Sequence, residues 1–127
     1  MKIGVAAGDH SVIIWPLLCG MARAKLYLLT ADFIEGKEAE RIGLVSMALP
    51  KDQVLPKALE LAFRMAKGPQ FALSWTKRAL NNWLRVAGPM FDHSIALEML
   101  TFMSADASEG IQAVLEKRQP IYPSTKA

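Results

Sequence analysis

The residues whose types and spacing could do chemistry gather in the first eleven positions. The stretch MKIGVAAGDHS places Gly4 and Gly8, which allow close backbone approach or a positive φ, before the carboxylate of Asp9. Such a carboxylate can line a ligand cleft and move a proton. Asp9 or Ser11 can also cap the apolar helix that follows, by accepting a hydrogen bond from a free first-turn amide. The residues alone leave both interpretations open.

The other reactive residue types are isolated. Cys19 is the single cysteine and lies in an apolar run, which predicts a buried thiol, no disulfide and a reducing, cytoplasmic environment. His93 has no second His or Cys and no carboxylate pair at metal-ligand spacing. We therefore predict neither a metal site nor a bound cofactor.

Composition limits the classes of partner. The 127 residues are 52% hydrophobic, which indicates either a large core or an apolar face that meets a partner. The net charge is +3, and the basic residues are scattered, so we expect no nucleic-acid binding. No run of apolar residues is long enough for a membrane span. A few Lys and Arg side chains could still contact a phosphorylated small molecule.

Hydrophobic periodicity predicts helices for most of the chain. Residues 12–29 should form two pieces separated at Gly20, and a short helix should start at Glu35 and end at Gly43. The apolar run Leu44–Leu49, closed by Pro50, predicts a short strand. Further helices are expected over residues 51–68, 70–84, 90–103 and 104–118, with a loop at Gly88-Pro89 and capping residues at Asp52 and at Asp106 with Glu109.

Four stretches in order carry a resemblance to a known family. They read WPLLCGMARAKLYLLT, then AERIGLVS, then GPQFALSWTKRALN and finally SADASEGIQAVLEKRQPIY. Together they resemble the enoyl-CoA hydratase/isomerase (crotonase) family. The resemblance covers essentially all of this chain but only about the latter half of the family.

The resemblance implies a mainly α fold. Residues 1–50 would be the closing segment of a crotonase-type spiral, and residues 51–127 the C-terminal helical oligomerisation module. In that family the loop corresponding to Gly4–Ser11 lies beside the acyl thioester, which makes Asp9 a candidate catalytic residue and Gly4 and Gly8 candidate CoA-binding positions. Lys117 and Tyr122 match residues near the CoA nucleotide.

The resemblance also implies what the chain lacks. The family's oxyanion-hole amides and first catalytic Glu belong to the half that is not matched, and the second catalytic Glu would fall before Met1. We therefore expect an enoyl-CoA hydratase/isomerase-like protein of acyl-CoA metabolism that is inactive alone. The alternatives are a non-catalytic helical oligomerisation or partner-binding module and a CoA-binding module. We also expect a homo-oligomer, assembled through Trp15, the helices of residues 12–29 or the Met-rich residues 90–103.

Overall fold

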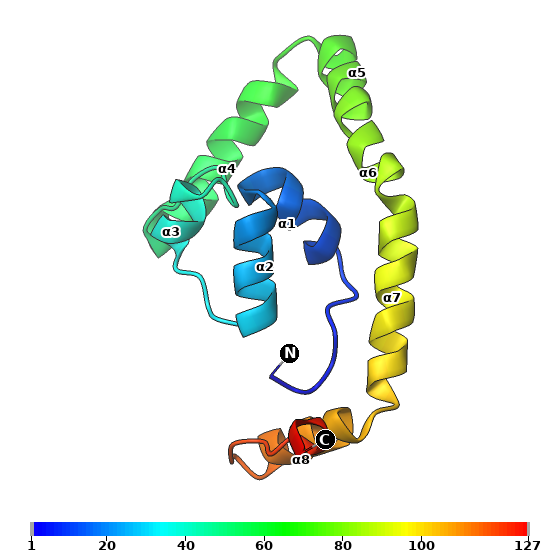
Figure 1. Ribbon diagram of the computed structural model, residues 1–127. Helices are drawn as coiled ribbons and strands as arrows, with labels where there is room; N and C mark the ends of the chain where they lie inside the picture. Colours follow the sequence, from blue (N-terminus) through cyan, green and yellow to red (C-terminus); the bar gives the residue numbers. More distant parts are fainter. Residues whose placement is uncertain (1, 127) are drawn as a thin grey trace. The chain divides into compact units, whose positions relative to one another are not determined.

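The computed structural model describes residues 2–126, and these are mainly helical, as the sequence predicts (Figure 1). The helices in chain order are α1 (Ser11–Cys19), α2 (Met21–Thr30), α3 (Gly36–Arg41), α4 (Lys51–Ala66), α5 (Gln70–Leu80), α6 (Asn82–Val86), α7 (Gly88–Phe102), α8 (Ala105–Leu115) and the 3-10 turn η1 (Pro123–Lys126). None of the described helices is both long enough and apolar enough to cross a membrane.

The helices group into two compact units. The first unit joins the chain up to Ile34 with the chain from Gly88 onward, and the second contains Glu35–Ala87. The division at residue 50 expected from the sequence separates two parts of a family's fold, and it does not describe compact units. That division stays a prediction.

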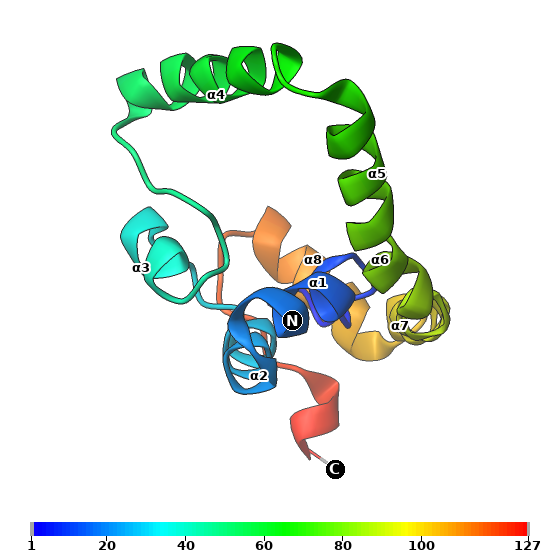
Figure 2. The same cartoon turned by 90° about the horizontal axis from the view of Figure 1, so that it is seen from above.

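In the first unit, α1 packs on α2 and on α7, and α7 leads into α8 (Figures 1 and 2). The break between α1 and α2 falls at Gly20, as predicted, where φ is +82°. Residues with a side chain rarely adopt this φ, so glycine at this position lets the chain turn sharply.

The N-terminal segment of this unit lies directly against α8. A Cβ added to Gly110 would come within 2.3 Å of the Ile3 carbonyl carbon, and one added to Gly4 within 2.3 Å of the Asp106 carbonyl oxygen. Gly4 also has a φ of +72°. The buried residues of these two segments include Val5 before α1 and Ala107 and Ala113 on α8.

The second unit is a chain of amphipathic helices with little core. None of the residues of α4, α5 and α6 is buried. The turn between α4 and α5 is fixed by Gln70, whose Nε2 donates to the carbonyl oxygens of Met65, Ala66 and Gly68 at 3.0, 3.0 and 2.8 Å. This side chain supplies donors that the last carbonyls of a helix otherwise lack.

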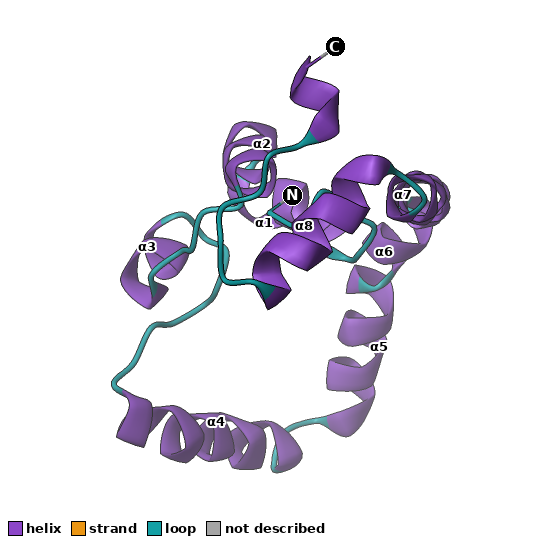
Figure 3. Ribbon diagram, turned by 90° about the horizontal axis from the view of Figure 1, so that it is seen from below, coloured by secondary structure: helices purple, strands orange, loops and turns teal. Residues whose placement is uncertain are grey.

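The predicted strand Leu44–Leu49 is wrong. The structure has no strand within residues 2–126, and Figure 3 draws this stretch as a loop. The Leu44 and Val45 amides instead donate to the Ala39 carbonyl at 2.8 and 3.3 Å, which closes the end of α3 at Gly43, where φ is +81°. A strand requires a partner that pairs with its amides and carbonyls, and the described residues provide none.

Three local predictions also need correction. The expected helix over residues 70–84 is interrupted at Asn81, a residue type that competes for backbone hydrogen bonds. The expected loop at Gly88-Pro89 is the first turn of α7, where the missing proline amide costs nothing.

The third correction concerns the caps. Asp52 makes no side-chain capping bond, because it lies inside the first turn of α4. At α8 the cap is Ser104, whose hydroxyl accepts from the Ala107 amide at 3.1 Å, rather than Asp106.

Candidate functional site

The loop that carries Asp9 borders a cleft within the first unit. Its volume is about 370 Å³. The wall comes from the N-terminal segment, the start of α1, the end of α2 and the second half of α7. The lining residues are Ile3, Val5, Ala6, Ala7, Asp9, Ser11, Trp15, Tyr27, Leu28, Ala31, Asp32, Phe33, Glu98 and Phe102.

Asp9 is exposed and is held in a local turn at the start of α1. Its Oδ1 accepts a hydrogen bond from the Ser11 amide at 2.7 Å and another from the Ser11 hydroxyl. Asp9 therefore serves the first helical amide and lines the cleft at the same time. The N-cap residue of α1 is His10, so neither Asp9 nor Ser11 is the N-cap, although Asp9 bonds the first helical amide. The catalytic role of Asp9 stays a prediction.

Gly8 is buried and packs against α7 through a single side chain. A Cβ at Gly8 would lie 2.5 Å from Glu98 Oε2 and 2.6 Å from Glu98 Cβ. Close packing against Glu98 therefore explains why residue 8 is a glycine. At position 4 the close Asp106 backbone and the positive φ explain the glycine. The contribution of Gly4 and Gly8 to CoA binding stays a prediction.

Thr101, one turn beyond Glu98 on α7, holds the same loop. Its Oγ1 accepts from the Ala6 amide at 3.0 Å. Neither Glu98 nor Thr101 is predicted as a site residue from the sequence alone. The local sequence around each of them indicates only a helix. They become part of the site because α7 packs against the N-terminal segment.

Lys117 and Tyr122 lie apart from the Asp9 cleft. Lys117 is exposed just past α8, with a φ of +54°. Tyr122 donates its hydroxyl to the Lys2 carbonyl at 2.7 Å. Neither lines the cleft. The structure therefore brings together Asp9, Gly8 and Glu98, but not the two predicted nucleotide-contact residues.

The segment after α8 is fastened back onto that helix by its acidic residues. Glu109 accepts from Arg118 and from the Ile121 amide, the latter at 2.8 Å, and Asp106 accepts from the Ser124 amide at 3.0 Å. The carboxylates of Glu109 and Glu116 together raise the pKa of the Arg118 guanidinium. This network fixes the backbone on both sides of Tyr122.

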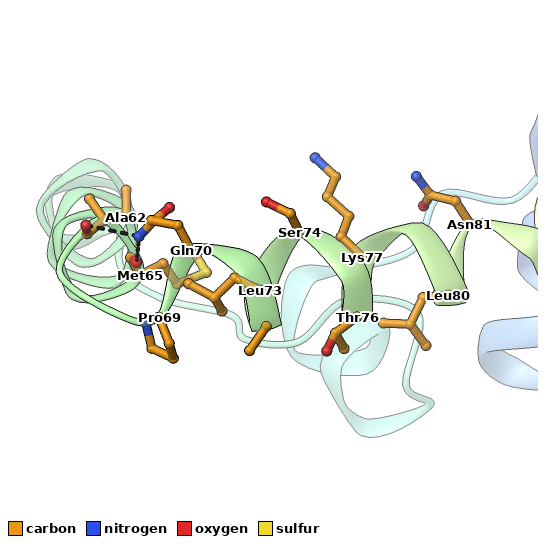
Figure 4. Close-up of a pocket in the computed structure, with 12 residues that line it drawn as sticks. Ala62, Met65, Pro69, Gln70, Leu73, Ser74, Thr76, Lys77, Leu80 and Asn81 are labelled. Atoms are coloured by element: carbon orange, nitrogen blue, oxygen red, sulfur yellow. Dashed lines mark hydrogen bonds between the residues drawn. The ribbon is translucent and has the colours of Figure 1, made fainter.

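A second concavity lies in the second unit, between α4 and α5. It measures about 760 Å³. Figure 4 shows Ser74 and Lys77 projecting from one side of α5, with Thr76 and Leu80 on the other. Most of its wall is apolar. No group of three or more His, Cys, Asp or Glu residues within the described part of the chain could hold a metal ion.

Comparison with known proteins gives consistent matches. A family model described as "Enoyl-CoA hydratase/isomerase" matches residues 1–125. A crotonyl-CoA hydratase of Syntrophomonas wolfei is 33% identical over 121 residues, which are 92% of this chain and 45% of that protein. A putative enoyl-CoA hydratase of Thermus thermophilus is 35% identical over 124 residues, 94% of this chain and 47% of the relative.

Solved structures agree. A carnitinyl-CoA hydratase from Mycobacterium avium superimposes with a TM-score of 0.87 at 28% identity, over 97% of this chain and 49% of that one. The chain thus spans about half the length of the proteins it matches.

Proposed function

Because this chain belongs to the enoyl-CoA hydratase/isomerase family, we propose that it takes part in acyl-CoA conversion as the C-terminal half of a catalytic unit. One observation carries the proposal: the family match spans residues 1–125, while the chain covers only 45% of its crotonyl-CoA hydratase relative. The reaction type is hydration or isomerisation of an enoyl thioester, and the acyl group is left open.

Asp9 is the proposed catalytic carboxylate of this half. It lies on a loop that borders a cleft and is held there by its bonds to Ser11. A carboxylate at a cleft wall can transfer a proton to or from a bound thioester. Gly4 and Gly8 keep the loop close to α8 and α7.

Lys117 and Tyr122 are the proposed contacts for the CoA nucleotide. Lys117 presents an ammonium group to solvent, where it can pair with a phosphate. The Tyr122 ring is held by the bond from its hydroxyl to Lys2. A free chain with this half-site would bind CoA thioesters without converting them.

The proposed inactivity of the 127 residues alone follows from the chemistry. Thioester enolates are stabilised by preorganised donors aimed at the developing oxyanion, usually two backbone amides, and loss of one such donor costs roughly 100- to 1,000-fold in rate. The resemblance implies that those amides belong to the family's other half. The buried Cys19 thiol is the basis for proposing a reducing, cytoplasmic setting.

The binding claim is tested by calorimetric titration with butanoyl-CoA, a saturated thioester that cannot be hydrated. We expect heat of binding, and Lys117→Ala should weaken affinity roughly two- to fivefold, the size of an exposed ion pair. Lys117→Arg should retain affinity. Lys67→Ala, which removes an exposed lysine after α4, is the matched control. No heat with a folded chain, or equal weakening in the control, would overturn the assignment.

The inactivity claim is tested with crotonyl-CoA. Loss of the enoyl absorbance should proceed at the buffer rate when the chain alone is added. Turnover above the buffer rate that disappears in Asp9→Asn would overturn the inactivity and support Asp9 as the catalytic carboxylate.

A second candidate function is a non-catalytic module that self-associates or binds a protein partner. It is favoured by α4, α5 and α6, which expose large apolar side chains such as Phe71, Trp75 and Trp83. A third, a CoA-binding module without catalysis, predicts the same calorimetric result as the main proposal. The two differ in whether a first-half polypeptide from a relative restores turnover.

A further inference from the structure

The loop before Asp9 is held at two points by one face of α7. The first point is Thr101, whose Oγ1 accepts a hydrogen bond from the Ala6 amide at 3.0 Å. The same hydroxyl donates its only proton to the Glu98 carbonyl at 2.7 Å. The donated bond fixes the direction of the hydroxyl proton, and one of the two lone pairs accepts from the loop.

The second point is Glu98, three residues before Thr101 on α7. Its side chain covers the face of Gly8 where a Cβ would stand, with Cβ, Cδ and Oε2 all within 2.8 Å of that position. Gly8 is buried by this contact, and Glu98 is half-buried. Because Gly8 has no Cβ, the Glu98 side chain can occupy the space where that atom would stand.

These contacts flank Ala7 and come directly before Asp9. Ala6, Ala7, Asp9 and Glu98 all line the 370 Å³ cleft. We propose that Thr101 and Glu98 are positioning residues that set where Asp9 stands at the cleft. An effect of Thr101 and Glu98 on a bound acyl thioester rests on the proposed function. Their contacts with the loop do not depend on it.

The first arm of the test uses the free protein. Amide hydrogen exchange at Ala6 is measured by NMR in wild type, Thr101→Ser and Thr101→Val. Valine preserves shape but cannot accept a hydrogen bond, so Ala6 should exchange about tenfold faster, as expected for the loss of one bond. Serine should restore protection. The Asp9 amide resonance should shift in the valine variant and return in the serine variant.

The control amide is that of Arg118, which donates to the Ala113 carbonyl at 2.9 Å in the same unit. General destabilisation would speed exchange at both amides, whereas a local role affects Ala6 alone. Equal effects at the two amides, or unchanged Ala6 exchange in Thr101→Val, would overturn the positioning role.

The second arm measures butanoyl-CoA affinity. Ala6, Ala7, Asp9 and Glu98 line the cleft, so displacement of the loop changes the surface that a bound ligand would contact. We expect Thr101→Val and Glu98→Ala to weaken binding several-fold, and Thr101→Ser to retain it. Wild-type binding that Thr101→Val leaves unchanged would overturn the proposal. A wild type that binds no butanoyl-CoA, while Ala6 responds as expected, would overturn the proposed function and leave the hold on the loop supported.

Discussion

Glycine residues in this chain differ sharply in what surrounds them, although the sequence shows them alike. Gly110 lies inside α8, and its Cβ position meets the backbone of Ile3 at 2.3–2.7 Å. Gly88 begins α7, and nothing lies within 4 Å of its Cβ position. A backbone cannot rotate away as a flexible side chain can. Gly110 is therefore required by packing, whereas Gly88 is not.

This contrast predicts that alanine substitutions at Gly110 and Gly88 change the free energy of unfolding in opposite directions. Overpacking costs about 1–3 kcal/mol, and alanine in a helix gains about 0.5–1 kcal/mol over glycine. Gly110→Ala should therefore lower the free energy of unfolding by about 1–2 kcal/mol, and Gly88→Ala should raise it by about 0.5 kcal/mol. Urea denaturation followed by circular dichroism measures both. Stabilisation by Gly110→Ala would contradict the close contact between α8 and the N-terminal segment.

At the scale of elements, the helix ends were predictable where a local rule applies. Gly43 has the positive φ expected of a C-cap glycine, and the break between α1 and α2 falls at Gly20, as predicted. The loop conformation of Leu44–Leu49 was not predictable, because a strand needs a pairing partner, and local sequence does not show whether one is present. The site shows the same limit: Ala6 and Thr101 are 95 residues apart, and no spacing indicates that they meet. Asp9 was identified because its chemistry and its glycine neighbours are local.

The ends of α2 and α6 provide a matched pair of alanines. Ala31 ends α2 with a φ of +55°, and Ala87 ends α6 with a φ of −81°. A left-handed residue with a Cβ costs about 1–2 kcal/mol, whereas replacing alanine by glycine costs about 0.4–1 kcal/mol through unfolded-chain entropy.

Ala31→Gly should therefore stabilise the protein by about 0.5–1 kcal/mol, and Ala87→Gly should destabilise it by a similar amount. Thermal unfolding at equal protein concentration compares them. Two changes of the same sign would show that these two ends do not differ in φ as described.

At the scale of the whole molecule, the buried apolar side chains belong to alanine, cysteine and β-branched residues. The buried apolar residues are Val5, Ile13, Cys19, Ala24, Ala39, Ile42, Ala107 and Ala113. Among the described residues, no Leu, Met, Phe, Trp or Tyr is buried, although these types dominate the core of an ordinary domain. The large apolar side chains of the described residues are therefore exposed or half-buried.

From that exposure we predict that the isolated chain self-associates. Met90 and Leu97 lie two turns apart on α7 and are 65% and 45% exposed. Burying apolar surface yields about 25 cal/mol per Å², so contacts between such faces favour dimers or trimers over the monomer. Sedimentation velocity at micromolar concentration should show species larger than 14.0 kDa.

The variant carrying both Met90→Lys and Leu97→Lys should shift this distribution toward the monomer, because a lysine ammonium resists desolvation at an apolar contact. Ser108→Lys is the control, since it adds the same charge at an exposed polar position on α8. A wild type that sediments only as a monomer would remove the oligomerisation module from the candidate functions. If the oligomer distribution does not change in the α7 variant, the contact lies on another face, such as that of Trp75 and Trp83 in the second unit.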